Sequence, residues 1–247
     1  MLKLTRASEN PILAPTPEHD WEYKASFNPC VVYHNGLYHM LYRALSPKQA
    51  YYGVELELST IGHATSTDGI HFTQRQKFIK PEHDWEFYGC EDPRITKVGD
   101  KFYIFYTALS NWPPGADDIK IALATTSDFK TIESKHLVTP FNAKAGALFP
   151  ERINGKVGML LSANTDSPPT YLACAFADTI EDFYSEDFWR EWHTHIADYA
   201  LPLRRNDSDH IEMGAPPIRT EYGWLLIYSY IVNYFHQPMT FTIEARS

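Results

Sequence analysis

The chain is sparing in the features that mark several classes of protein. It has three cysteines, Cys30, Cys90 and Cys174, and an odd number inside strand-like stretches favours buried thiols in a reducing compartment over a disulfide framework. Its 22 Lys and Arg are outnumbered by 31 Asp and Glu, so the basic surface that nucleic acid or an anionic membrane requires is missing. No apolar run approaches the roughly 18 residues of a membrane span, and residues 1–9 lack a signal core. We therefore expect a cytoplasmic protein with neither nucleic-acid nor membrane partners.

Aromatic residues, by contrast, are abundant. They make up 15% of the chain, with 16 Tyr, 14 Phe and 6 Trp. Aromatic side chains are enriched in strands, and their ring faces also stack on the apolar faces of sugars. This composition favours a strand-rich protein and is compatible with a sugar-binding cleft.

A pattern of paired strands occurs four times after an irregular lead-in over residues 1–27. Each copy has a start that contains proline, a short apolar strand, a turn that contains glycine, and a second strand of large apolar residues. Asn-Gly and Gly-Asp between apolar runs are strong hairpin signals. The copies start near residues 28, 92, 149 and 215, and their turns fall at 34–36, 99–100, 154–155 and 222–223.

A third strand of small residues follows in the first three copies, and an aspartate (Asp68, Asp128 or Asp178) closes each one as an expected turn residue. Radial repetition of such a unit is the signature of a β-propeller. The sequence therefore predicts an all-β fold and a single domain over residues 1–247. The early end of the fourth copy leads us to expect that a last, C-terminal blade is missing. Residues 179–210 interrupt the pattern and are predicted to form a partly helical insertion over one face.

The stretch Gly89 to Arg94 concentrates charge at the start of the second copy. Glu91 and Asp92 are adjacent acids beside Pro93, a costly arrangement unless the acids are paired or useful. The other three copies lack this cluster, so we predict that it is the centre of the chemistry rather than a surface ion pair. The neighbouring Cys90 is expected to be a buried thiol, because nearby carboxylates raise the pKa of a thiol.

Metal binding is not expected. His193 and His195 have the spacing of two ligands on a strand, but no third ligand is evident in the sequence.

Four motifs together resemble glycoside hydrolase family 130, which comprises β-mannoside phosphorylases and β-mannosidases. They are Ser26 to Pro29, Gly89 to Arg94, Leu148 to Lys156, and Gly214 to Ile218 with Gly223 to Tyr228. The resemblance covers about residues 26 to 245. It implies a five-bladed β-propeller with the active site in its central funnel, of which this chain covers about four blades.

The resemblance also implies roles for individual residues. Asp92 is placed as the general acid of an inverting reaction, with the proton passing through a sugar hydroxyl. Asn28, Arg43 and Arg94 are placed as contacts of the mannosyl ring, although Arg94 could instead hold the Asp92 carboxylate. Three further charged residues complete the substrate-binding set: Glu91, Glu151 and Arg152. Glu151 and Arg152 could equally form a structural ion pair.

The nucleophile is the open question. Phosphorylases of the family carry a His-Arg pair where this chain has Leu161 and Ser162, and a histidine where it has Ser229, whereas a basic residue is kept at Lys120. Phosphate recognition depends on charge-assisted hydrogen bonds, so these departures favour water and hydrolysis, with a divergent phosphate site as the alternative.

A hydrolase needs a carboxylate base. Asp207, Asp209 and Glu212 are available, and we prefer Glu212 because it lies two residues before Gly214.

The leading hypothesis is thus an inverting enzyme that hydrolyses β-mannosidic bonds in manno-oligosaccharides. The alternatives are a phosphorylase that releases mannose 1-phosphate and a carbohydrate-binding propeller without catalysis. No metal or organic cofactor is expected, and inorganic phosphate is a co-substrate only in the phosphorylase. The sequence leaves the linkage, and whether the protein forms a homo-oligomer, open.

Overall fold

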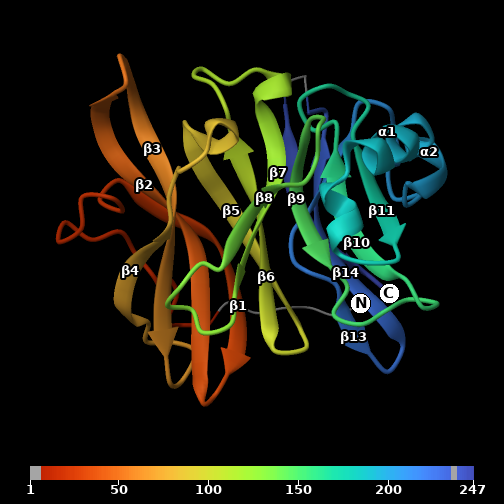
Figure 1. Ribbon diagram of the computed structural model, residues 1–247. Coiled ribbons are helices and arrows are strands. Elements are labelled where there is room, and N and C mark those ends of the chain that lie inside the picture. The colour runs from red at the N-terminus through yellow and green to blue at the C-terminus, as the bar shows by residue number, and fades with distance from the viewer. Residues whose placement is uncertain (1–6, 235–237) are drawn as a thin grey trace.

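A computed structural model describes residues 7–234 and 238–247, so the first six residues of the expected lead-in lie outside the described part. The chain is mostly β, and antiparallel units follow one another along it (Figure 1). The first unit contains β1 Ala25–His34, β2 Leu37–Tyr51, β3 Val54–Ser66 and β4 Thr73–Ile79, and the second β5 Gly89–Val98, β6 Lys101–Leu109, β7 Ile119–Thr126 and β8 Ser134–Leu137. The third contains β9 Ala143–Leu148, β10 Val157–Ala163 and β11 Tyr171–Ala177, and the fourth β12 His210–Met213, β13 Ile218–Thr220, β14 Gly223–Val232 and β15 Thr240–Arg246.

Helices are short and few in the described residues. They are η1 Asp84–Glu86, η2 Ala116–Asp118, η3 Glu181–Tyr184, α1 Glu186–Thr194 and α2 Ile196–Tyr199. Within the ranges that the structure describes, none has the length and apolar character needed to cross a membrane.

Three hydrophobic clusters hold successive units together. One lies between the first and second units, one between the second and third, and one between the third and fourth. The first two units also share a sheet edge, because Ser59 of β3 pairs in parallel with Gly89 of β5. Burial of apolar surface between neighbouring sheets is therefore what fixes each unit against the next.

A β-bulge interrupts the first strand of three units at equivalent places. The bulged residues Asn28, Asp92 and Ala145 have φ of 49°, 52° and 49°. Each bulge follows a residue paired with the second strand: Phe27 with Arg43, Glu91 with Thr107, and Lys144 with Ser162. The fourth unit has the corresponding pair Glu212 with Ser229. The units thus present Phe27, Glu91, Lys144 and Glu212 at matching positions.

The third unit differs from its sequence prediction. Its first strand is β9, Ala143–Leu148, whereas the pattern placed it at residues 149–153. Pro150 lies after the strand, in a loop whose turn is closed by the bridge between Ile153 and Lys156. The bulge is occupied by Ala145 and Gly146, where a Cβ on Gly146 would meet the Met159 side chain at 2.6 Å. Proline therefore marked the wrong position, because close packing at this bulge selects glycine instead.

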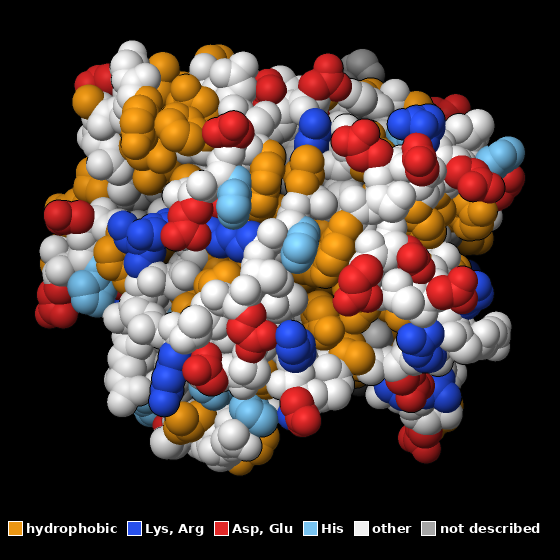
Figure 2. All heavy atoms as spheres, viewed as in Figure 1, with side chains coloured by type: hydrophobic (Ala, Val, Ile, Leu, Met, Phe, Trp, Pro, Cys, Tyr) orange, Lys and Arg blue, Asp and Glu red, His pale blue; other side chains and the backbone are white. Residues whose placement is uncertain are grey.

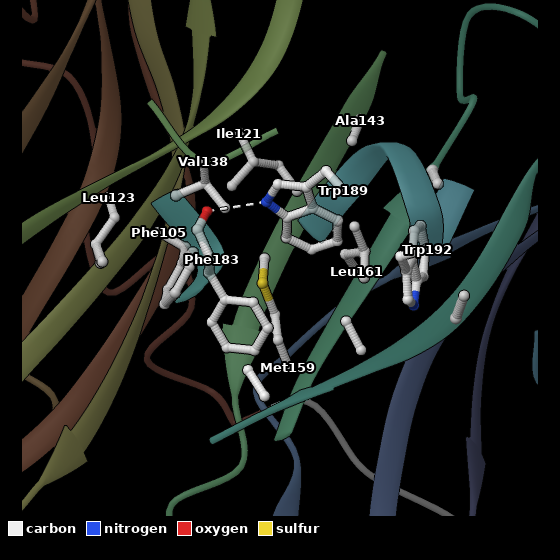
Figure 3. Close-up of a cluster of buried hydrophobic side chains, with 14 of the residues drawn as sticks. Phe105, Ile121, Leu123, Val138, Ala143, Met159, Leu161, Phe183, Trp189 and Trp192 are labelled. Atoms are coloured by element: carbon white, nitrogen blue, oxygen red, sulfur yellow. Dashed lines mark hydrogen bonds between the residues drawn. The ribbon is translucent and has the colours of Figure 1, made fainter. Parts of the chain in front are cut away.

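The insertion at residues 179–210 is partly helical, as predicted. Helix α1 begins after Ser185, whose hydroxyl accepts a hydrogen bond from the Phe188 N–H. Its two tryptophans, Trp189 and Trp192, are buried against the third unit (Figure 3), and Trp189 Nε1 donates to the Phe183 carbonyl at 2.9 Å. The insertion is thereby part of the core.

His193 and His195, whose sequence spacing would suit two ligands on a strand, lie at the end of a helix. His193 lies in the last turn of α1 and His195 follows the helix, so the two are not carried by a strand. His193 instead contacts Asn164 Oδ1 at 3.1 Å.

Two of the three predicted turn aspartates act as expected. Asp68 Oδ1 accepts hydrogen bonds from the backbone N–H groups of Ile70 and His71. Asp128 Oδ1 accepts likewise from Lys130 and Thr131. Asp178 differs, because it forms an ion pair with Lys156 at 2.6 Å.

A buried histidine pair in the first unit should make stability depend on pH. His39 Nδ1 lies 3.0 Å from His63 Nε2, and burial lowers the pKa of His63 from 6.5 to about 4. As the pH falls, His63 is therefore protonated in the unfolded chain before it is protonated in the folded protein. The stability associated with neutral, buried His63 is fully present above pH 6.5 and is lost as the pH falls towards 4. We expect the free energy of unfolding to fall by about 2 kcal/mol from this group between pH 7 and pH 5, measured by urea denaturation. The His63→Gln variant should lose less stability over that interval, and an equal loss would contradict the assignment.

Candidate active site

Asn28 and Asp92 meet across the junction of the first two units. Both occupy bulges with positive φ, a conformation that Asn and Asp tolerate better than other side chains. A bulge re-aims the side chain it carries. Here Asn28 Nδ2 donates to Asp92 Oδ1 at 2.8 Å. The two residues lie 64 positions apart in the sequence, so the contact depends on the docking of whole units.

Arg43 completes this contact from the second strand of the first unit. Its guanidinium lies 2.5 Å from Glu91 Oε1 and 3.7 Å from Asp92 Oδ1. Its Nε donates to Ser59 Oγ at 3.0 Å, and its Cζ lies 4.8 Å from the centroid of the Phe27 ring. A planar guanidinium held on several sides is preorganised to orient carboxylates or sugar hydroxyls.

Glu91 is the more enclosed of the two adjacent acids. Burial raises the pKa of Glu91, the charge of Arg43 opposes this shift, and the neighbouring Asp92 charge reinforces it. The positive charge of Lys144 also acts on Glu91. The site is therefore extended by the third unit.

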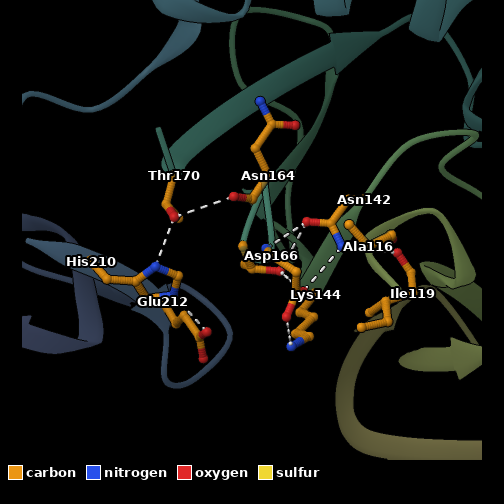
Figure 4. A network of polar contacts seen from close by, with 10 residues as sticks. Ala116, Ile119, Asn142, Lys144, Asn164, Asp166, Thr170, His210 and Glu212 are labelled. Carbon is orange, nitrogen blue, oxygen red and sulfur yellow. Dashed lines mark hydrogen bonds and ion pairs between the residues drawn. The ribbon is translucent and has the colours of Figure 1, made fainter. Parts of the chain in front are cut away.

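Lys144 was missed by the sequence analysis. It occupies the position of the third unit that matches Glu91 in the second, and its Nζ lies 3.0 Å from Asp166 Oδ1 (Figure 4). Burial works to lower the pKa of Lys144, but the Asp166 charge and hydrogen bond outweigh it, so its pKa lies above the usual range. Asp166 is itself held by Asn142 Nδ2 at 3.1 Å and Thr165 Oγ1 at 2.8 Å. The ammonium is thus fixed and charged.

Glu212 occupies the matching position of the fourth unit. Its Oε1 lies 2.7 Å from His210 Nε2, and His210 Nδ1 lies 2.7 Å from Thr170 Oγ1 (Figure 4). The ring of His210 is buried and stacks on Tyr234 at 4.0 Å. The Glu212 charge acts on both Lys144 and Tyr234, so these groups belong to one electrostatic environment.

Three predicted residues make contacts other than with Asp92. Arg94 is 8% exposed, its guanidinium donates to the Pro93 carbonyl at 2.8 Å, and it lines a cavity of about 260 Å³ between first strands. Glu151 pairs with Arg219 at 3.4 Å on the surface, and Arg152 donates to the carbonyls of Gly155 and Asp178. The structure therefore does not bring Glu151 and Arg152 to Asp92.

Two of the positions that depart from the phosphorylase pattern, Leu161 and Ser162, have structural roles. Leu161 is fully buried, and Ser162 Oγ accepts a hydrogen bond from Met213 N at 2.8 Å, which ties the third unit to the fourth. Ser229 lies opposite Glu212. Lys120 lies on β7 opposite Ala108, which in turn pairs with Cys90.

Burial raises the pKa of the Cys90 thiol well above its usual value, and the Glu86 charge adds to the effect. Its Sγ donates to Glu86 Oε2 at 3.3 Å. This agrees with the expected inert thiol, although the decisive carboxylate is Glu86 rather than Glu91.

Known proteins of similar sequence include β-mannoside phosphorylases. A family model for glycoside hydrolase family 130, described as β-1,4-mannooligosaccharide phosphorylase, matches residues 3–237. The 1,2-β-oligomannan phosphorylase of Thermoanaerobacter sp. (strain X514) is 37% identical over 232 residues, which cover 92% of this chain and 72% of that protein. The β-1,2-mannobiose phosphorylase of the same organism is 35% identical over 244 residues, with coverage of 94% and 74%.

Solved structures share the fold. The β-1,2-mannobiose phosphorylase from Listeria innocua, in complex with β-1,2-mannobiose, matches with a TM-score of 0.69 and 24% identity, covering 97% of this chain and 77% of that one. A structure described among glycoside hydrolases of the family that target β-1,2 mannosidic linkages in Candida mannan matches with a TM-score of 0.66 and 22% identity, with coverage of 91% and 68%.

Proposed function

Since the chain belongs to glycoside hydrolase family 130, whose members include β-mannoside phosphorylases and hydrolases, we propose that it cleaves β-1,2-mannosidic bonds with inversion and with phosphate as the nucleophile. From the sequence alone, water was the preferred nucleophile and phosphate the alternative. The similarity to two curated relatives that are both β-1,2-mannoside phosphorylases favours the alternative. The expected products are mannose 1-phosphate and a shortened mannoside.

The observation that carries this proposal is the Asp92 carboxylate held between Asn28 and Arg43. Both partners engage Oδ1, which leaves Oδ2 to carry a proton to the leaving oxygen, directly or through a sugar hydroxyl. The C1–O bond then breaks, the leaving oxygen takes the proton, and a phosphate oxygen bonds to C1 from the opposite face. Asn28, Arg43 and Glu91 are the groups that would orient the mannosyl ring.

Lys144 is our candidate for holding phosphate. It is a fixed ammonium at the position that matches Glu91, and Asp166 keeps it charged. Lys120 is a second basic candidate on the neighbouring unit. Charge-assisted hydrogen bonds from such groups are what bind an anion in a partly desolvated site. This would replace the basic residues absent at Leu161, Ser162 and Ser229.

The same proposal extends to the architecture. The successive antiparallel units, joined by hydrophobic clusters, are consistent with four blades of a five-bladed propeller. Their matching first-strand positions, Glu91, Lys144 and Glu212, would then face a shared central funnel.

The test is product identification. We expect the chain, incubated with β-1,2-mannobiose, to release α-mannose 1-phosphate only when phosphate is present, as measured by phosphorus NMR. Release of free mannose at an equal rate without phosphate would overturn the phosphorylase and support hydrolysis. In that case Glu212 becomes the candidate base, because His210 positions its carboxylate at 2.7 Å.

A further inference from the structure

Four aromatic side chains cluster on the surface where the β2–β3 hairpin ends. Tyr52 lies 4.6 Å from Phe87 and 4.8 Å from Tyr51 between ring centroids, and Tyr88 lies 5.2 Å from Phe87. Tyr52 is 74% exposed. Figure 2 shows a broad hydrophobic patch at the upper left, where Figure 1 places the tip of β2 and β3. We call Tyr51, Tyr52, Phe87 and Tyr88 the aromatic platform.

The backbone conformation at Tyr52 favours a residue other than tyrosine. Tyr52 and Gly53 form the hairpin turn with φ of 45° and 88°. Two other hairpin turns have almost the same geometry, with φ of 50° and 81° at Asn35-Gly36 and 50° and 80° at Asn154-Gly155. Asparagine is favoured at the first position of this turn, whereas an aromatic side chain with positive φ is strained. At the β2–β3 turn the chain carries tyrosine in place of the residue that the backbone prefers.

The aromatic platform is linked to the candidate active site by a short path. Tyr88 directly precedes Gly89, which pairs with Ser59, and Ser59 Oγ accepts from Arg43 at 3.0 Å. At about 3.3 Å per residue of extended strand, the Cα atoms of Tyr88 and Asp92 can lie up to roughly 13 Å apart. This distance exceeds the reach of the sugar ring at the reacting bond, and it suits a ring farther along the same oligosaccharide.

We propose that the aromatic platform is a remote sugar-binding subsite that stacks a mannosyl ring several units from the scissile bond. The proposal rests on the proposed function and adds a preference for oligosaccharides over the disaccharide. Exposed ring faces match the apolar faces of a pyranose, and the hydroxyls of Tyr51, Tyr52 and Tyr88 can bond sugar hydroxyls at the rim. An aliphatic protein interface would not need this combination of ring face and hydroxyl.

The experiment compares substrates of two lengths. For each variant, kcat/KM is measured with β-1,2-linked mannobiose and mannotetraose at saturating phosphate. Tyr52→Asn suits the positive φ, so the hairpin is retained. We expect it to lower the ratio of kcat/KM for tetraose over biose by about three- to tenfold. Tyr52→Trp, which keeps a ring face, should restore most of the ratio. Tyr222→Asn is the matched control, because Tyr222 is 83% exposed in the β13–β14 turn, outside the aromatic platform.

An unchanged ratio in Tyr52→Asn would overturn the subsite. So would a change of sedimentation coefficient in that variant, because it would show that the aromatic platform joins two copies of the chain. If the unsubstituted chain turns over neither sugar, the proposed function is wrong, whether or not the subsite exists. The subsite is then tested by calorimetry with mannotetraose, where weaker binding by Tyr52→Asn supports it and equal or absent binding overturns it.

Discussion

Replacing Asp92 by asparagine should lower kcat for β-1,2-mannobiose by about a hundred- to ten-thousandfold, because the proton donor is removed while the site is otherwise kept. Asparagine accepts the φ of 52° found at this bulge, and its carbonyl oxygen can still accept from Asn28 Nδ2. The fold should therefore be unaffected, which circular dichroism and the thermal midpoint would check.

Asp100→Asn is a matched control for the Asp92 variant. Asp100 is exposed in the turn of the same β5–β6 hairpin, and its replacement should leave kcat within twofold or so of the unsubstituted chain. If Asp92→Asn kept its turnover, another group would have to protonate the leaving oxygen.

Replacing Lys144 by methionine should have the second large effect. If its ammonium binds phosphate, kcat/KM for phosphate should fall by roughly ten- to hundredfold, as expected for the loss of one charge-assisted hydrogen bond. The KM for the mannoside should change much less, and this difference separates a phosphate contact from general damage. Steady-state kinetics with each substrate varied in turn would measure both quantities.

The matched control for Lys144 is Lys156→Met. Lys156 also pairs with an aspartate of the third unit, Asp178, but on the exposed surface. Exposed ion pairs contribute little to stability, so the Lys156→Met variant should stay folded and both of its KM values should be unchanged. A Lys144→Met variant in which both KM values rise equally would assign Lys144 to the support of Asp166 rather than to phosphate.

Local signals in the sequence were sufficient for much of the fold. The glycine-containing turns and the apolar second strands act over a few residues, and the structure has hairpins at 34–37 and 98–101 where they were predicted. The third unit was placed too late because proline served as the marker. At Ala145-Gly146 the same bulge is set by close packing against Met159, and no turn residue or proline announces it.

The site was only partly accessible from the sequence for a related reason. Asn28, Glu91 and Asp92 lie in recognisable motifs. Arg43 was implied by the family resemblance, and the structure brings these four residues together. Lys144 could be found only from its register with Ser162, which depends on the correct placement of β9. Arg94 shared the motif, yet it lies beyond the bulge, where its guanidinium turns to the Pro93 carbonyl and the cavity between the first strands.

The contacts that position Asp92 cross from the first antiparallel unit to the second. Asn28 and Arg43 belong to the first unit, whereas Glu91 and Asp92 belong to the second, and the two meet at the edge shared by Ser59 and Gly89. Within residues 7–234 and 238–247, the proposed site therefore needs at least two hairpins, one from each of the first two units. We therefore expect that separation of the two units at this junction would abolish activity while the hairpins themselves stay folded.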